Sequence, residues 1–238
     1  DWVAGSPSVQ LRWGIGSGSS STDLGWNLDD IQISGAGSII PINYLLTTSA
    51  NNPAWGTFNP INGIYPVGTA VQITASPTTY YRFVNWTGDA SGTNNPLTVA
   101  LTTNLSVQAV FSEILTTNHP TPFWWLASVG YTQNLESAVS GLGANGFPLW
   151  QSYIAGLDPS DPSSQLRLSL QPVGGGHLAL SWETVPGRVY TVWASGDPLT
   201  GFAPLTNAVN LPAAITSLTN DFSAGSTPTY YRLEVKKP

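Results

Sequence analysis

The chain has 238 residues, of which 41% are hydrophobic and only 8% are charged, whereas about 25% of the residues of an ordinary soluble domain are charged. The net charge is -6, and the 7 Lys and Arg residues stand singly except for Lys236 and Lys237. Binding to a nucleic-acid backbone requires clustered cations, so we exclude this class of partner. No apolar run approaches the roughly 20 residues of a membrane-spanning helix, and we expect no membrane span.

The sequence contains no Cys and no Met. Disulfides therefore cannot indicate the redox compartment, and we expect the chain to be a processed piece of a longer polypeptide. Its apolar and polar residues alternate in short runs, and clusters of Gly, Pro, Asn and Ser interrupt these runs. This pattern predicts an all-β fold.

Two strand patterns open the chain, at residues 9–15 and 26–34, and a loop rich in Gly and Ser joins them. They predict a β-hairpin within residues 1–37. A hairpin alone is marginally stable in water, so this orphan hairpin needs further strands from elsewhere. Those strands come either from a neighbouring subunit or from the rest of a longer parent chain.

Three further regions follow the hairpin. Residues 38–115 predict one small antiparallel β module, with strands at 42–47, 56–59, 70–75, 83–87, 97–101 and 106–111. Residues 116–163 predict a short helical joint, because apolar residues recur at helical spacing over 132–142 and 149–155. Residues 164–238 return to alternation and predict at least five strands of a sandwich-like module. We expect residues 116–122 and 158–164 to be linkers.

Glycine, proline and aromatic residues recur in a specific order through the second region. The pattern comprises Gly56, Pro60, Gly63, Tyr65, Gly68, Val71, Ile73, Ala75, Pro77, Tyr81, Phe83, Trp86, Gly88, Pro96, Val107, Ala109 and Phe111. It resembles the divergent internalin-type B repeat of bacterial surface proteins, over about residues 40–112. The resemblance implies a β-grasp-like spacer or adhesive module without enzymatic activity, at the bacterial cell surface or outside the cell, with Phe83 and Trp86 in its core.

Two weaker resemblances flank this region. Residues 25–31, with the sequence GWNLDDI, resemble the last strands of jelly-roll domains in secreted bacterial proteins. The segments PFWW, WQSYIAGLD and YYRL, at residues 122–125, 150–158 and 230–233, resemble the C-terminal regions of large secreted proteins from Verrucomicrobia-type bacteria. In that family a calcium-binding loop precedes the second segment. Here Gly141, Gly143, Asn145 and Ser152 stand at its ligand positions, so we do not expect calcium at this loop.

Acidic residues in the hairpin are the better candidates for a metal site. Asp23, Asp29 and Asp30 lie in or beside the hairpin loop, and calcium prefers carboxylate oxygens. The alternative is that one carboxylate accepts hydrogen bonds from loop amides while another is solvated. We expect no other cofactor.

The sequence offers few residues and motifs that could carry catalysis. The chain lacks a Gly-x-Ser-x-Gly motif, a His-Glu-x-x-His motif and a P-loop. Its two histidines, His119 before Pro120 and His177 after three glycines, are expected at the surface. We therefore assign no catalytic residue and predict that the chain is not an enzyme.

Exposed tryptophans can stack on sugar rings, and secreted β modules often bind carbohydrate in this way. The candidates for carbohydrate binding are Trp55, Trp124, Trp125 and Trp193. The alternative for each is packing inside a module or between two modules.

The combined pattern favours a structural subunit of an extracellular bacterial assembly, such as a filament, in which the hairpin completes a neighbouring subunit by β-strand complementation. A surface with so little charge is prone to associate. The residues assigned to self-assembly are Val9, Leu11, Trp13, Trp26, Leu28, Ile31 and Ile33. The alternative is a C-terminal spacer, anchor or glycan-binding region of a large secreted peptidase or polysaccharide hydrolase.

Overall fold

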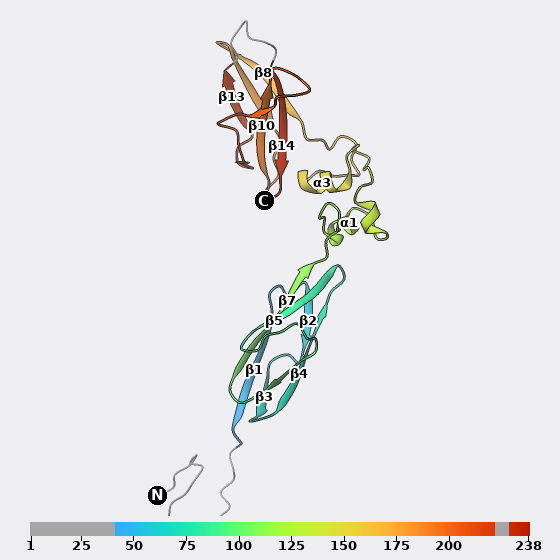
Figure 1. The fold of residues 1–238 in the computed structure, drawn as a ribbon, viewed down its shortest axis with the longest axis vertical. Coiled ribbons are helices and arrows are strands. Elements are labelled where there is room, and N and C mark those ends of the chain that lie inside the picture. The colour runs from blue at the N-terminus through green and yellow to red at the C-terminus, as the bar shows by residue number, and fades with distance from the viewer. Residues whose placement is uncertain (1–40, 222–228) are drawn as a thin grey trace, which may run out of the picture. The chain divides into compact units, whose positions relative to one another are not determined.

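The computed structural model describes residues 41–221 and 229–238, which form mainly β-strands with three short helices (Figure 1). The all-β class is therefore confirmed. The predicted hairpin lies outside the described residues, together with the metal candidates Asp23, Asp29 and Asp30 and the self-assembly residues from Val9 to Ile33. Within the described part of the chain, no helix is long and apolar enough to cross a membrane.

The first module contains seven strands, coloured blue to green in Figure 1. They are β1 (Asn43–Ala50), β2 (Gly56–Asn59), β3 (Gly63–Pro66), β4 (Ala70–Pro77), β5 (Tyr81–Gly88), β6 (Leu97–Ala100) and β7 (Leu105–Glu113). One sheet has the order β3-β1-β7-β5 and the other the order β2-β4-β6. The short strand β3 was not expected from the sequence.

One strand pair departs from the expected antiparallel arrangement. β1 and β7 are parallel, and their register runs from Leu46 opposite Leu105 to Ala50 opposite Ala109. All other pairs described in this module are antiparallel. Alternation in the sequence indicates which face a side chain occupies, but it carries no information on the direction of the neighbouring strand.

Aromatic residues fill the space between the two sheets. Trp86 and Phe111 are fully buried, and the Phe83 ring packs against both, with centroid distances of 5.2 and 6.2 Å. The buried indole Nε1 of Trp86 donates a hydrogen bond to the carbonyl of Asn94 (3.0 Å). Trp86 therefore lies in the core, as the resemblance implied, and the partly buried Phe83 packs against it.

The helical segment has its own small core. It contains α1 (Phe123–Ser128), α2 (Leu135–Ala138) and α3 (Leu149–Ala155). Helix α3 coincides with the predicted helix, α2 is shorter than predicted, and α1 was not predicted. Leu126, Leu135, Val139 and Leu149 form the buried cluster between them.

Helix α3 ends at Gly156, which has a left-handed conformation with φ 72°. A Cβ atom at this position would also lie 2.8 Å from Cγ1 of Val185. Both the backbone conformation and the close approach of Val185 therefore require glycine at the end of α3.

The two segments expected as linkers are ordered by side-chain hydrogen bonds. In residues 116–122, the hydroxyl of Thr116 donates to the carbonyl of His119 (2.9 Å) and accepts from the backbone N–H of Thr121 (3.0 Å). In residues 158–164, Asp158 and Asp161 each accept the N–H of the serine two residues later, at 2.8 Å. Short polar side chains therefore stabilise turns in both segments, and their role as linkers stays a prediction.

The C-terminal module contains β8 (Leu168–Gly174), β9 (His177–Trp182), β10 (Val189–Ser195), β11 (Ala203–Pro204), β12 (Leu211–Pro212), β13 (Ser217–Asp221) and β14 (Tyr230–Lys236). β13, β9 and β8 form one sheet, and β10 pairs with β11, β12 and β14 in the other. All described pairs in both sheets are antiparallel. The two sheets share one buried cluster that includes Leu180, Tyr190 and Val192, as a sandwich-like module requires.

The packing of Gly56 gives a test of the first module. A Cβ added to Gly56 would lie 2.5 Å from Cε1 and Cζ of the buried Phe111 ring. We expect Gly56→Ala to lower the free energy of unfolding by about 1–3 kcal/mol, because a tightly packed core accommodates an extra carbon only with strain. Urea unfolding of the full chain measures the change.

Gly63→Ala is the matched control, since its Cβ would meet only the outer atoms of the half-buried Tyr65 side chain. Equal losses of stability in the two variants would contradict this account of the core.

Candidate functional site

A pocket of about 710 Å³ opens where the helical segment meets the C-terminal module. Its lining includes Trp124, Trp125, Tyr153, Asp158, Arg188 and Lys237. The structure thus brings together two of the four tryptophans assigned to carbohydrate binding. It adds polar and charged side chains that the sequence pattern did not assign to any site.

Trp124 forms an aromatic wall of this pocket. It lies in the first turn of α1, and its side chain is 36% exposed. Its indole Nε1 donates a hydrogen bond of 2.7 Å to Oε1 of Glu113, at the end of β7. This bond fixes the ring from one edge, so the exposed ring surface is held in place for a ligand.

Trp125 and Tyr153 lie deeper in the pocket. Their rings are 5.2 Å apart between centroids and inclined by 58°, which is a favourable arrangement for an aromatic pair. Trp125 is half-buried and Tyr153 is buried. We therefore expect these two rings to support the pocket, while Trp124 offers the larger exposed surface.

Two cations hold the end of α3 against the C-terminal module. The Arg188 guanidinium donates through Nε to the carbonyl of Ile154 and through Nη2 to that of Tyr153, the latter at 2.7 Å. Lys237 Nζ donates to the Tyr153 hydroxyl and lies 4.2 Å from the centroid of the same ring. Cations at a helix C-terminus satisfy its free carbonyls and interact favourably with its dipole.

Asp158 supplies the carboxylate of the pocket. The side-chain hydroxyl of Ser160 donates to Oδ1 at 2.6 Å, and the backbone N–H of Ser160 donates to the same atom at 2.8 Å. Both bonds hold the pKa of Asp158 below its usual value, and the bond from the Ser160 hydroxyl has the larger effect. Asp158 is therefore ionised at neutral pH and able to accept hydrogen bonds from a ligand.

The other two tryptophan candidates lie elsewhere. Trp55 stacks on Tyr81, with centroids 5.2 Å apart and planes inclined by 20°, and packs against the core of the first module. Trp193 lies on β10 and donates from Nε1 to Oε2 of Glu234 at 3.0 Å. Neither residue lines the pocket that contains Trp124.

The histidines lie in separate segments of the chain. The exposed His119 ring stacks on Trp150 with a centroid distance of 4.3 Å and an interplanar angle of 4°. His177 begins β9. Among residues 41–221 and 229–238, no group of three or more His, Asp or Glu side chains is arranged to hold a metal ion. The assignments of no catalytic residue and no enzymatic activity stay predictions.

The loop that corresponds to the calcium-binding loop of the resembling family is closed by neutral groups. Asn145 is 4% exposed, and its Nδ2 donates to Oγ of the fully buried Ser152 at 3.1 Å. Its Oδ1 accepts the backbone N–H of Phe147 at 3.1 Å. The side chains of Asn145 and Ser152 therefore bond directly to each other. A calcium ion at this loop would instead require carboxylate ligands.

Several pocket residues were absent from the sequence-based assignment. Arg188 and Lys237 are two of only 7 cations in the chain. In a sequence with so few charges, each isolated cation is a candidate for a specific contact. The scarcity of cations could therefore have identified Arg188 and Lys237 as candidate site residues. That Asp158 lines the same pocket as Trp124 of α1 could not be predicted from the sequence, because the two residues are 34 positions apart.

Ser152 provides a test of the neutral loop. Ser152→Ala removes the partner of the buried Asn145 amide, and we expect a loss of about 1–3 kcal/mol in the free energy of unfolding, because a buried donor is left without an acceptor. Chemical unfolding of the full chain measures the loss. Ser137→Ala removes a hydroxyl that bonds the Asn134 carbonyl at the surface, and serves as control. An unchanged stability in Ser152→Ala would overturn this role.

Comparison with known proteins identifies one part of the chain. Residues 46–115 match the family model described as the divergent InlB B-repeat domain. Neither the curated proteins nor the solved structures contain a significant match. The B-repeat family is typical of bacterial surface proteins. The first β module of this chain therefore matches the divergent InlB B-repeat family, as the sequence pattern predicted.

Proposed function

We propose that this chain is a non-catalytic, glycan-binding region of an extracellular bacterial protein, and that the pocket around Trp124 receives the glycan. The observation that carries the proposal is the Trp124 ring, which is fixed by Glu113 and exposed beside the Asp158 carboxylate. The match to a family typical of bacterial surface proteins supports the extracellular setting.

The chemistry of the pocket suits a neutral sugar. The apolar face of a pyranose ring packs on an indole surface, while its hydroxyls donate to a carboxylate. The two cations are already engaged with carbonyls and with the Tyr153 ring. Their engagement disfavours a ligand whose affinity depends on negative charge.

Trp124→Ala tests this proposal. We expect the affinity for the bound glycan to fall at least tenfold, about 1.4 kcal/mol, because an exposed aromatic anchor carries much of the energy of such a contact. Isothermal titration calorimetry with soluble cellulose, xylan and chitin oligosaccharides measures the affinity.

Trp193→Ala is the matched control, since Trp193 also bonds a glutamate through Nε1 but lies outside the pocket. Failure of the native chain to bind any of these oligosaccharides, or equal effects of the two substitutions, would overturn the proposal.

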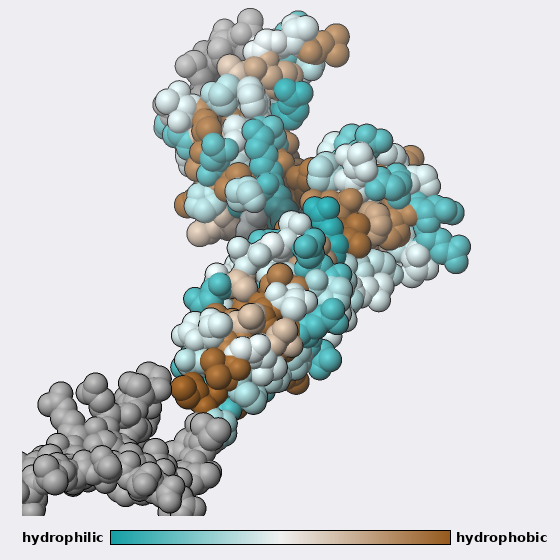
Figure 2. Space-filling model, turned by 60° about the horizontal axis from the view of Figure 1, so that its bottom comes forward, coloured by the Kyte–Doolittle hydropathy of each residue, from teal (hydrophilic) through white to brown (hydrophobic). Residues whose placement is uncertain are grey.

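Self-association is a second candidate function, and the edge of the first module favours it. β3 is an edge strand, and the exposed Ile64 on it lies opposite the exposed Leu45 of β1. Ile42, Ile61 and Val67 are also exposed. Figure 2 shows hydrophobic surface gathered at the end of this module from which β1 starts.

Charged residues usually guard such an edge. The sequence contains no charged residue between Asp30 and Arg82. We therefore propose that this edge pairs with a second copy of the chain. Complementation through the N-terminal hairpin is a separate route to assembly, and the hairpin residues stay its proposed contacts.

Ile64→Lys tests the edge. The Ile64 side chain is 72% exposed, so we expect the variant to fold normally but to lose any concentration-dependent association, because a lysine at an open edge opposes strand pairing. Sedimentation velocity over a range of concentrations measures it. Leu142→Lys, at a side chain that is 67% exposed in the helical segment, is the control. Association that persists in Ile64→Lys would exclude the β3 edge as the contact.

A further inference from the structure

The free edge of β3 differs from the opposite edge of its sheet, which is formed by β5. On the side of β5 away from β7, the N–H of Trp86 donates to the carbonyl of Gly92 (2.7 Å), and its carbonyl accepts from the N–H of Gly92 (3.3 Å). β5 also has a register shift between Phe83 and Asn85 and carries the charged Arg82. A covering segment, a bulge and a charge each oppose the pairing of an edge. Within the described residues, β3 has none of these three features.

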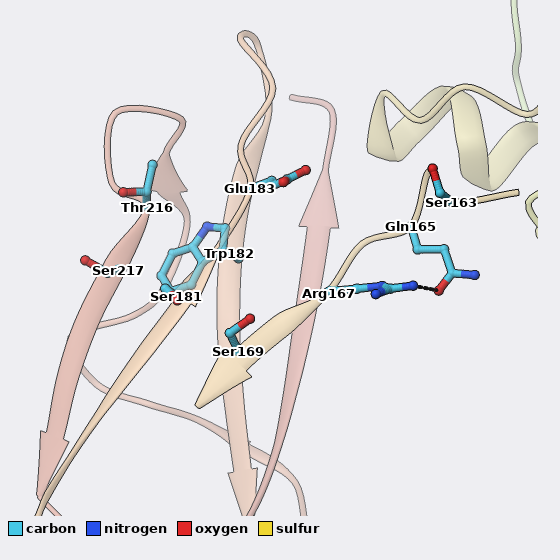
Figure 3. A pocket seen from close by; sticks show the side chains of 9 residues that line it. All are labelled: Ser163, Gln165, Arg167, Ser169, Ser181, Trp182, Glu183, Thr216 and Ser217. Atoms are coloured by element: carbon cyan, nitrogen blue, oxygen red, sulfur yellow. Dashed lines mark hydrogen bonds between the residues drawn. The ribbon is translucent and has the colours of Figure 1, made fainter. Parts of the chain in front are cut away.

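Two edge strands of the C-terminal module are protected as well. β8 contains Pro172 and has a register shift between Pro172 and Gly174. The exposed Arg167 stands just before β8, where its Nη2 donates to Oε1 of Gln165 at 3.2 Å (Figure 3). The edge strand β14 carries three charged residues, Arg232, Glu234 and Lys236. Proline, bulges and charges oppose strand pairing, so the edge of β3 is open by comparison.

The hydrogen bonds between β3 and β1 show which backbone groups face the free edge. In an antiparallel pair, residues that bond to the neighbouring strand alternate with residues whose N–H and carbonyl point away. The N–H of Val67 bonds to the carbonyl of Ile42 (2.8 Å), so in the register of this pair Tyr65 also faces β1. Ile64 therefore faces the free edge with both its N–H and its carbonyl. Pro66 faces it too, but has no N–H to donate.

The side chains at this edge are apolar and exposed. Ile64 is 72% exposed and lies directly opposite Leu45 of β1, which is 42% exposed, so both project from the same face. The N–H of Leu45 bonds away from β3, to Oδ1 of Asn104 at 2.8 Å, as the same alternation requires. Neither β1 nor β3 contains a charged residue. Two identical edges can therefore approach each other without repulsion between charges on these strands.

We propose that two copies of the chain pair antiparallel through β3, with Ile64 opposite Ile64 on a two-fold axis. In this register the N–H of each Ile64 donates to the carbonyl of the other, as in a hydrogen-bonded antiparallel pair. A parallel pairing would instead need an N–H from Pro66. The two-fold register also joins Leu45 and Ile64 of both copies into one apolar row across four strands. The proposal rests on the second candidate function, the pairing of this edge with a second copy.

The symmetry determines how many copies this edge joins. A two-fold pairing uses the same edge of both copies, so it is closed and gives a dimer. Pairing of β3 with β5 would use two different edges and could continue from copy to copy. The bonds between Trp86 and Gly92 oppose this second arrangement, because they occupy backbone groups on the β5 side. A filament would therefore need a further contact, such as the predicted N-terminal hairpin.

Disulfide trapping of the full chain tests the register, because the native sequence contains no Cys. Across a hydrogen-bonded antiparallel pair, the Cα atoms of two opposed residues are about 5.5 Å apart, and disulfides join Cα atoms about 4.4–6.8 Å apart. We therefore expect Ile64→Cys to form a disulfide-linked dimer under mild oxidation. The dimer is expected to form at least tenfold faster than in Val67→Cys at the same protein concentration, as measured on non-reducing gels.

Val67→Cys is the matched control, since the Val67 side chain is 52% exposed and follows shortly after Ile64. In the two-fold register, the two residues at position 67 lie about 20 Å apart along the strands, too far for a disulfide. In a parallel, in-register pairing they would lie as close together as the residues at position 64. Both substitutions replace exposed side chains, so both variants are expected to fold, and equal urea unfolding under reducing conditions checks this.

The outcomes separate this proposal from the function on which it rests. Equal trapping in Ile64→Cys and Val67→Cys would overturn the two-fold register and leave association through the edge intact. Absence of trapping in Ile64→Cys, together with loss of association in Ile64→Lys, would also contradict the register alone. Association that persists in Ile64→Lys, or a native chain that stays monomeric at every concentration, would overturn both.

Discussion

The first module depends on asparagine side chains that pair with the backbone of neighbouring strands. Asn51 accepts the N–H of Phe111 through Oδ1 and donates to the carbonyl of the same residue through Nδ2, both at 3.0 Å. Asn95 makes the same pair of bonds with Ala75, at 2.9 and 2.8 Å. Each amide thus acts as one more residue of a strand. These bonds require no charged side chain, so they are available to a chain in which only 8% of the residues are charged.

The same neutral chemistry recurs outside the first module and shapes what the protein can recognise. The loop around Asn145 is closed by an amide and a hydroxyl. The charges that do occur near Trp124 are largely engaged by carbonyls, aromatic rings and hydroxyls. The pocket around Trp124 therefore favours ligands recognised by stacking and hydrogen bonding, and its proposed ligand is a neutral sugar.

The sequence predicted those features that depend on local patterns. The alternation around Trp86 indicated the strands of the first module, and the spacing in residues 149–155 indicated α3. The four-residue β3 has too short a pattern to be recognised, and α1 contains two adjacent tryptophans that hide its helical spacing. The pairing of Trp124 with Trp125 in one pocket followed from their adjacency. The alignment of Ser169, Ser181 and Ser217 across three strands could not be predicted, because the register of the strands decides which residues lie opposite each other.

The parallel pair of β1 and β7 has a mechanical consequence. These are the first and the last strands of the first module, and five residue pairs join them, from Leu46 with Leu105 to Ala50 with Ala109. In a parallel pair, the chain enters at one end of the first strand and leaves at the opposite end of the last. A force that stretches the chain therefore pulls the two strands past each other and loads all of their hydrogen bonds together, instead of opening them one at a time. Within the first module, stretching tension would therefore meet its greatest resistance at this pair.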